Sequence, residues 1–591
     1  MNYALTKPGQ ESRKTSVLPA LKKLASLMID DKGKLILAFI AIIINSALNL
    51  TAPILIGHAV DTYLVTKQYD GVLKYSGLLL LIYLGALVMS YLQTKLMGMV
   101  GQRMLFNLRH AIFTKLQQLP VAFFNQNKIG DLISRINNDT DKLNQFFSQS
   151  LMQFVGSIFI MVGSGISILL IRPRLALAAL APALGLLIFT RVISPWVKRK
   201  NALNLQSVGG MSAEIQESLN NFRVIVAFNR RDYFRNKFNE ANDVQYATAI
   251  KSGIANNIFT PVYGLCSNIA QLIVLAYGIN LIMIGDFTLG LLISFLTYMT
   301  RFYDPLRQLA SLWANFQVAL AGWDRISDIL ALESDLVVVR PGPWAEKPES
   351  TSSSVMSFVN VSFHYPDGKD VLKHITFNLE PGKTYALVGP TGGGKTTTAS
   401  LMARLYDPTD GMVMLHGRDI RGYRSEERAQ KIGFILQEPF LFTGTVRDNI
   451  IYGNPAYREH STEQLAAVLK ESGLEILLAR FEKGLDTPVL ASGDTISLGQ
   501  KQLIAFIRAV LRKPDILILD EATANIDTVT EQLLEEILKQ LPKTTTRVII
   551  AHRLNTIENA DEIFFINSGE VTLAGSMEHA VDMLLHGKRE S

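Results

Sequence analysis

The first half of the chain contains long apolar runs without a charged residue, and these runs constrain the fold more than any other feature. Examples are LILAFIAIIINSALNL at 35–50 and GLLLLIYLGALVMSYL at 77–92. About 20 apolar residues are what an α-helix needs to cross a hydrocarbon core of ~30 Å, whereas buried helices of a soluble protein seldom stay uncharged for so long. The pattern predicts six membrane-spanning helices, at 35–57, 73–98, 146–171, 175–195, 253–283 and 287–312, with the count left open in the poorly separated region 253–312.

The composition agrees with a membrane half joined to a soluble half. Of the 591 residues, 48% are hydrophobic and 19% are charged, and the net charge of +6 is modest for this length. The basic residues form no continuous stripe, so we expect no nucleic-acid partner. The single cysteine, Cys266, excludes an intramolecular disulfide, and the nine histidines include no HExxH metal pair.

The distribution of Lys and Arg predicts the orientation of the membrane half. The segments 99–145 and 196–251 are rich in basic residues, whereas the short loops on the other side hold few. Because basic loops stay in the cytoplasm, both long segments and both termini are expected there, as in a multi-pass protein of a bacterial inner membrane. Both segments keep helical spacing, so we interpret them as transmembrane helices extended beyond the bilayer. Their tips, near 123–136 and 212–222, are placed to contact a cytosolic domain, and the first contains a polar turn, NKIGD, at 127–131.

Residues 333–354 are rich in Pro, Ser and charge, which is typical of a linker. After them, short β-rich apolar runs alternate with helical stretches, the pattern of a mostly parallel sheet with crossover helices. The chain is therefore expected to be a multidomain protein. Its predicted parts are a cytoplasmic N-terminal segment (1–33), an all-α six-helix transmembrane domain (34–332), the linker (333–354) and an α/β P-loop nucleotide-binding domain (355–591).

The run GPTGGGKTT at 389–397 follows the apolar strand TYALVG and opens a helical stretch. Glycines let a backbone wrap closely round phosphate and point N–H groups at it, the lysine reaches the β- and γ-phosphates, and the following threonine can ligate Mg²⁺. The motif predicts an ATP and Mg²⁺ site that contains Gly389, Thr391, Gly392, Gly393, Gly394, Lys395, Thr396 and Thr397.

Other polar residues follow predicted strands of the same domain. Asp520 and Glu521 end the strand in ILILDEATANID, where one carboxylate can hold the Mg²⁺ shell and the next can polarise an attacking water. Two such residues alone would fit a solvated turn equally well, but the upstream phosphate loop favours the metal site. His552, after the strand in VIIAHRL, is expected near a γ-phosphate, and Gln437, after IGFIL, near the metal or the water. Tyr365, in VSFHYPDG, is a candidate for stacking on adenine, although one more sheet aromatic explains it about as well.

With these motifs, the second half resembles the nucleotide-binding domain of an ATP-binding cassette transporter. The first half resembles the six-helix exporter domain of the multidrug and lipid exporter family, with softer likenesses at GDLISRINNDT and VIVAF, and the resemblance covers roughly 20–585. It implies that Lys395 and Thr396 bind ATP and Mg²⁺ and that Asp520 supports the metal. It also implies that Glu521 is the catalytic base and that His552 senses the γ-phosphate. By the same resemblance, Gln437 relays to the membrane domain and Asp527 contacts the partner across the cassette interface.

The run TISLGQKQ at 495–502 resembles the signature Leu-Ser-Gly-Gly-Gln of the family, with Leu498 in place of the first glycine. Family members hydrolyse ATP between two cassettes, the phosphate loop of one facing the signature of the other. Ser497, Gly499 and Gln500 are retained at the start of a helix and are expected to bind phosphate. Leucine adds a Cβ and a bulky chain where glycine has free φ and allows close approach, so we expect weaker closure.

An intact catalytic half beside an imperfect signature resembles one subunit of the heterodimeric exporters of this family, in which the partner brings the complete signature. A homodimer that tolerates Leu498 is the alternative.

The sequence thus predicts ATP-driven export of a drug, lipid or peptide by alternating access, performed together with a second half-transporter subunit. A rival interpretation is an ATP-gated channel or regulatory subunit on the same frame, which Glu521 and His552 argue against. A soluble P-loop kinase is excluded by the membrane runs. Polar residues within those runs face a cavity or another helix and leave the substrate open: Asn45, Asn49, Gln153, Asn268 and Gln271.

Overall fold

The computed structural model describes residues 3, 5, 31–333, 354–366, 368–437, 439–490, 496–520, 528–550 and 558–586. Its contacts divide the chain into two compact units, and each is described on its own. The membrane unit comprises Thr6–Leu116 and Gly130–Ala331. The cassette unit comprises Met1–Leu5, Gln117–Ile129 and Leu332–Ser591.

The membrane unit consists of long helices. They are α2 (Lys32–Ala59, continued by the π-helix η2, Val60–Leu64), α3 (Tyr69–Gln118), α7 (Leu151–Ile171), α8 (Pro173–Asn220), α9 (Phe222–Ala227), α10 (Arg231–Asn257), α11 (Phe259–Met283) and α12 (Leu289–Leu330). At 1.5 Å per residue, the 50 residues of α3 extend about 75 Å, far more than a ~30 Å hydrocarbon core requires. The predicted extension of helices beyond the bilayer is therefore confirmed.

Five of the helical spans in the described residues are long and apolar enough to cross a membrane: Lys32–Leu64, Tyr69–Gln118, Ile129–Ile171, Pro173–Asn220 and Arg231–Met283. The sixth predicted span lies in α12, which is not among the five. Three charged residues interrupt its apolar run, at Arg301, Asp304 and Arg307.

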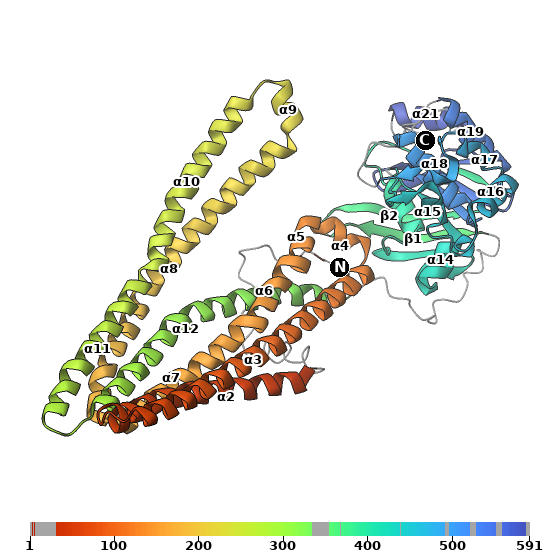
Figure 1. Ribbon diagram of the computed structural model, residues 1–591. Helices are drawn as coiled ribbons and strands as arrows, with labels where there is room; N and C mark the ends of the chain where they lie inside the picture. Colours follow the sequence, from red (N-terminus) through yellow and green to blue (C-terminus); the bar gives the residue numbers. More distant parts are fainter. Residues whose placement is uncertain are drawn as a thin grey trace. The chain divides into compact units, whose positions relative to one another are not determined.

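Helix α12 packs along α7, α2 and α11, and α8 packs along α10 and α11. Figure 1 shows α8 and α10 side by side as a long antiparallel pair joined through α9. Ala179, Ala270 and Phe295 are fully buried where α8, α11 and α12 meet. On α3, by contrast, Leu81 and Leu87 are exposed, as lipid-facing side chains are expected to be.

A continuous helical segment leads from the first predicted tip into α7. It consists of α5 (Ile129–Ser134), the π-helix η3 (Arg135–Asp139), α6 (Thr140–Gln145) and the π-helix η4 (Phe146–Ser150). The turn before it contains only Asn127 and Lys128. The predicted polar turn at 127–131 is therefore wrong in its second half, because Asp131 is helical.

Asp131 belongs to a buried ionic cluster that joins this segment to α12. The guanidinium of Arg135, which is fully buried, donates from Nε to Asp131 Oδ2 at 2.9 Å and from Nη1 to Arg325 O at 2.6 Å. Arg325 of α12 pairs with Asp131 and, at 2.8 Å, with Asp139. Because buried charges require partners, the cluster fixes the segment against α12 in one arrangement.

The cassette unit contains a six-stranded sheet with the order β12-β11-β3-β10-β9-β6. Five strands run parallel and β12 is antiparallel to β11, which confirms the predicted mostly parallel sheet. The strands are β3 (Thr384–Val388), β6 (Ile432–Ile435), β9 (Ile516–Asp520), β10 (Thr546–Ile550), β11 (Glu562–Asn567) and β12 (Glu570–Leu573).

A second, antiparallel sheet with the order β2-β1-β4-β5 was not predicted. Its strands are β1 (Met356–His364), β2 (Asp370–Leu379), β4 (Asp410–Leu415) and β5 (Arg418–Asp419). The short strands β7 (Gly444–Thr445) and β8 (Pro488–Val489) pair with each other. One apolar core, which includes Phe358, Leu387 and Ile518, is shared by the two larger sheets.

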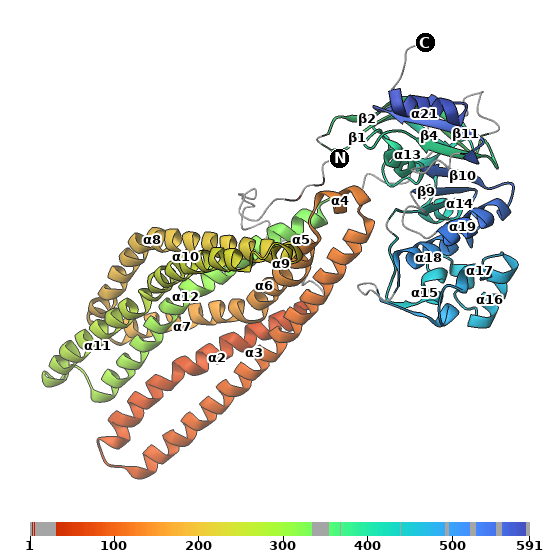
Figure 2. The same cartoon turned by 90° about the horizontal axis from the view of Figure 1, so that it is seen from above.

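The α-helices of the cassette are α13 (Lys395–Met402), α14 (Ser425–Lys431), α15 (Val446–Ile451), α16 (Thr462–Glu471), α17 (Glu475–Leu478), α18 (Leu498–Val510), α19 (Thr528–Gln540) and α21 (Met577–His586). Figure 2 shows α15, α16, α17 and α18 gathered into a helical cluster, which has its own buried core around Leu465, Leu477 and Phe506. Since β3, β6, β9 and β10 run parallel, the residues that follow them emerge at one edge of the sheet.

Candidate functional site

The loop between β3 and α13 has a backbone that requires glycine. Gly389 has a φ of 148°, and a Cβ at this position would lie 2.0 Å from Ile566 O. Gly394, the residue before α13, has a φ of 116°. A side chain at either position would clash or be strained. The sequence therefore forms a tight cradle at the N-terminus of α13, where free backbone N–H groups favour an anion.

Lys395 holds its charge inside this cradle. The residue is only 6% exposed, and its Nζ donates to Gly389 O at 2.8 Å and to Pro390 O at 3.1 Å. The neighbouring hydroxyl residue Thr396 is exposed at the first turn of α13, and Thr391 and Gly392 lie exposed at the rim of the loop. A held cation, backbone N–H groups and a hydroxyl oxygen are the groups that phosphate and Mg²⁺ require, so the residues present fit both.

The strand register brings Asp520 to the same edge of the sheet. Asp520 ends β9, is 4% exposed and pairs with Ile550 at the end of β10, which also pairs with Leu387 near the end of β3. The cradle begins two residues after Leu387. Gln437 is exposed and comes two residues after Ile435, which pairs with Leu519, so it lies beside the carboxyl end of β9.

The structure thus collects the phosphate loop, Asp520 and Gln437 at one edge. The other predicted members of the site, Glu521, Asp527 and His552, lie outside the described residues, and their roles stay predictions.

Tyr365, just after β1, lies against the phosphate-loop helix. Its hydroxyl is 3.1 Å from Thr397 Oγ1, and its ring packs edge-on against Phe363 and Tyr406, with centroid distances of 5.0 and 5.4 Å. The predicted adenine residue and the phosphate loop are therefore neighbours. Tyr365 also packs on the apolar core, as the alternative interpretation expected, so stacking on adenine stays a prediction.

The signature segment begins α18 through a capping box. Ser497 is the N-cap: its Oγ accepts from Gln500 N at 3.2 Å, and Gln500 Oε1 accepts from Ser497 N at 2.9 Å. Leu498 is the first residue of the helix, is 41% exposed and does not have a positive φ. The expectation that glycine's freedom of φ matters here is therefore wrong. Only the exposed side chain distinguishes Leu498 from glycine.

Sequence reasoning missed a contact between a tip helix and the cassette. Helix α4 (Val121–Gln126) belongs to the cassette unit, and Asn125 Nδ2 donates to the Tyr406 hydroxyl at 2.6 Å. Burial raises the pKa of the Tyr406 phenol above its ordinary value, although the hydrogen bond from Asn125 lowers it, so the phenol stays neutral. The first tip was predicted to contact a cytosolic domain, and the structure shows its contact with the cassette. No periodicity or motif marks Asn125 or Tyr406 in the sequence.

The first residues of the chain bind the end of α4. Tyr3, which is 2% exposed, donates from its N to Gln126 Oε1 at 2.8 Å and accepts from Asn127 Nδ2 at its O at 2.9 Å. Leu5 N donates to Asn127 Oδ1 at 3.0 Å. The amide of one asparagine therefore pairs with both a backbone C=O and a backbone N–H, as a neighbouring strand would.

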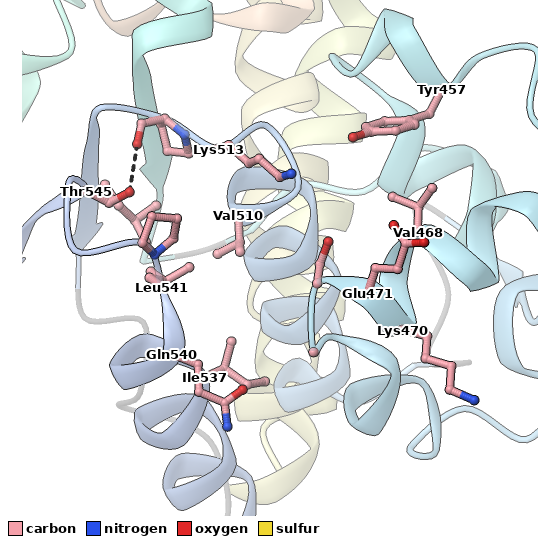
Figure 3. A pocket seen from close by; sticks show the side chains of 15 residues that line it. Tyr457, Val468, Lys470, Glu471, Val510, Lys513, Ile537, Gln540, Leu541 and Thr545 are labelled. Carbon is pink, nitrogen blue, oxygen red and sulfur yellow. Dashed lines mark hydrogen bonds between the residues drawn. The ribbon is translucent and has the colours of Figure 1, made fainter.

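A separate cavity of about 620 Å³ lies on the cassette between α16, the end of α18 and α19 (Figure 3). Its lining includes Tyr457, Val468, Val510 and Thr545, whose Oγ1 donates to Pro514 O at 3.2 Å. It contains none of the residues predicted to contact ATP, so it is not the nucleotide site.

Comparisons with known proteins agree with this geometry. The family described as ABC transporter transmembrane region matches residues 35–306, and the family described as ABC transporter matches residues 372–524. The uncharacterized ABC transporter ATP-binding protein YfiC of Bacillus subtilis is 33% identical over 95% of this chain and 92% of its own length.

Two other relatives have names that mention a substrate or a resistance. A fatty acid ABC transporter ATP-binding/permease protein of Mycobacterium bovis is 32% identical over 84% of this chain and 78% of its own length. A multidrug resistance ABC transporter ATP-binding and permease protein of Lactococcus lactis is 31% identical over 85% of this chain and 84% of its own length. With apolar spanning helices and a phosphate-binding cassette in one polypeptide, this chain is a multi-pass membrane protein of the ABC transporter family, whose cassette hydrolyses ATP to drive transport.

Proposed function

We propose that this chain is one half of a dimeric exporter that carries an apolar or amphipathic small molecule across a bacterial inner membrane, with its cassette in the cytoplasm. The observation that carries the proposal is the meeting of the Lys395 cradle, Asp520 and Gln437 at one sheet edge. The relatives named for fatty acids and for multidrug resistance favour a lipid or drug over a peptide as the substrate.

ATP with Mg²⁺ supplies the phosphoanhydride bond whose hydrolysis powers the cycle. Lys395 and the N–H groups of the loop would hold its β- and γ-phosphates. The Thr396 hydroxyl and the Asp520 carboxylate would hold Mg²⁺. Glu521 would accept the proton of the attacking water, with Gln437 beside the same strand end to orient that water. His552 would contact the γ-phosphate.

The second half of each site would come from another cassette. The N-terminus of α18, with Ser497, Gly499 and Gln500, would face the partner's ATP, and Asp527 would contact the partner across the interface. The exposed Leu498 side chain stands at that N-terminus, where it would hinder close approach. We therefore propose a heterodimer in which this chain supplies the catalytic residues of the active site and the partner supplies the signature.

Helix α4 provides a route between nucleotide and membrane unit. Tyr365 packs on Tyr406, and Tyr406 accepts the hydrogen bond of Asn125 in α4, which follows directly on α3. A nucleotide that moves the Tyr365 ring would therefore shift the support of α4. This contact supports coupling through the first tip.

The test is steady-state ATPase activity and transport in proteoliposomes, measured for this chain alone and with a co-expressed partner. Vanadate-sensitive hydrolysis that Glu521→Gln removes, with ATP binding retained, is the expected result. A gated channel or regulatory subunit would instead bind ATP without vanadate-sensitive turnover, and that outcome would overturn the proposal.

A further inference from the structure

The face of α12 that does not pack against neighbouring helices is polar within the predicted span 287–312. Five exposed residues at spacings of one, three or four form what we call the polar stripe: Thr300, Asp304, Arg307, Gln308 and Ser311. The other face of the helix, with Tyr298 and Met299, is buried against α2, α7 and α11. Polar and charged side chains in a spanning helix avoid lipid and face a water-filled cavity or another protein surface.

Arg301 lies beside the polar stripe, within the predicted span 287–312. It follows Leu289, the first residue of α12, by 12 positions. That separation is about 18 Å along a helix. Its Nη1 donates to Asn49 Oδ1 at 3.4 Å, and Asn49 is itself held by Asn45 through a bond from Nδ2 to the Asn45 O at 2.9 Å. Arg301 is half-buried, with its charge between α12 and α2.

In the polar stripe and Arg301 together, the positive charges outnumber the negative ones. Across the part of the chain that the structure describes, no carboxylate lies within ion-pair distance of Arg301 or Arg307, and Asp304 is the one acidic residue of the polar stripe. The partner of Arg301 is a neutral amide. Cations without a carboxylate partner in a membrane-spanning segment are costly and mark functional positions, and the guanidinium fork matches the two oxygens of a carboxylate or phosphate.

We propose that the polar stripe and Arg301 bind the anionic head group of the transported amphiphile. Arg301 is the central contact. Arg307, nearly two turns further along α12, is a second cation that binds the same head group or contacts it while the substrate moves along the helix. The inference rests on the proposed export function and narrows its substrate to amphiphiles that carry a carboxylate or a phosphate. Asn49 positions the guanidinium from α2, and Gln271 of α11, whose Nε2 lies 3.5 Å from Thr300 Oγ1, flanks the stripe on the other side.

The test measures binding without ATP to the full chain, purified with its co-expressed partner in nanodiscs of a zwitterionic lipid, with empty nanodiscs as background. The probes share a twelve-carbon tail and differ in head group: radiolabelled dodecanoate, dodecyl phosphate and dodecyltrimethylammonium. Arg301→Gln is expected to weaken binding of the anionic probes roughly tenfold or more, as loss of a charge-assisted contact predicts, and to leave the cationic probe unaffected. Arg301→Lys should restore part of the affinity, because lysine keeps the charge without the fork. The two anionic probes distinguish a carboxylate from a phosphate head group.

A matched control removes an equal charge from another spanning helix. Lys95 of α3 is exposed and lies 5.8 Å from the centre of the Tyr91 ring, so Lys95→Gln should leave all three affinities unchanged. Equal binding of the anionic probes by wild type and Arg301→Gln would overturn the inference. A parallel loss of all three probes would also overturn it, because it would make Arg301 a helix-packing residue.

Hydrolysis in the same samples separates this inference from the proposed function. Vanadate-sensitive ATPase activity without head-group discrimination would overturn only the anionic site. Absence of that activity in wild type would overturn the export function itself.

Discussion

The position of Leu498 allows a test of how two cassettes divide catalysis between them. Because Leu498 has ordinary helical backbone at the start of α18, replacing it with alanine or with glycine removes the same exposed side chain, and only glycine also loosens the backbone. Glycine costs at most about 1 kcal/mol relative to alanine in a helix. In a domain of ~150–250 residues that lowers the Tm by about 2–4 °C. The capping box of Ser497 and Gln500 remains in both variants, so both should fold.

In a heterodimer, turnover takes place at the site that joins this chain's Glu521 to the partner's signature. Glu521→Gln should then remove nearly all hydrolysis, because an amide cannot accept the proton of the attacking water. Leu498→Ala and Leu498→Gly should change the rate only slightly, since they improve a site that scarcely turns over. In a homodimer both sites contain Leu498, so both substitutions should clearly alter turnover. The assay is steady-state ATPase activity of each variant, with this chain alone and with a co-expressed partner.

Two results would refute this reasoning. Robust activity of this chain alone, with a strong response to both Leu498 variants, would refute the heterodimer. A response to glycine without a response to alanine would refute the argument that only the side chain of Leu498 matters.

Lys395→Ala should weaken ATP binding at this chain's site tenfold or more, because it removes a charge-assisted phosphate contact of about 1.5–3 kcal/mol. Titration with labelled ATP measures the two affinities, and equal affinities of wild type and variant would contradict the assignment of the loop. Asn125→Ala and Tyr406→Phe each remove one partner of the hydrogen bond at α4. Both variants should keep the ATP affinity of wild type and move less substrate per ATP in proteoliposomes. An unchanged ratio of substrate moved to ATP hydrolysed would count against coupling through this contact. Arg135→Met should lower the free energy of unfolding by about 1.5–3 kcal/mol, because the fully buried guanidinium donates hydrogen bonds to both Asp131 and a backbone carbonyl. Thermal unfolding measures this loss, and a curve that matches wild type would exclude a stabilising role for the cluster.

The spanning helices were predictable because the requirement of a bilayer is local: enough apolar residues in a row. Their ends were not. Helix α3 continues to Gln118, 20 residues past the predicted end at residue 98, and this extension is held by buried side chains such as Leu108 and Ile112. Helix α12 likewise continues to Leu330, where the ionic cluster around Arg135 holds it. Packing between distant segments, not hydropathy, decides where these helices stop.

The phosphate loop and the strand that ends at Asp520 were also predictable, because each motif lies next to the apolar strand that positions it. The contact of Asn125 with Tyr406 could not be predicted from the sequence, because the two residues are 281 positions apart and belong to no motif. The start of the helix at the signature was predicted, but the emphasis on glycine's freedom of φ was not needed: Ser497 and Gln500 have the spacing of a capping box, which places residue 498 in the first turn of a helix.

The binding of Tyr3 and Leu5 to the end of α4 has a consequence for how the protein can be labelled. Asn127 and Gln126 hold the backbone of these first residues directly after the helix whose Asn125 supports Tyr406. Replacing the segment that contains Tyr3 and Leu5 with an affinity tag would therefore remove these contacts and disturb the surroundings of α4. The exposed turn at 65–67, in the membrane unit, offers an insertion point that leaves α4 and its partners untouched.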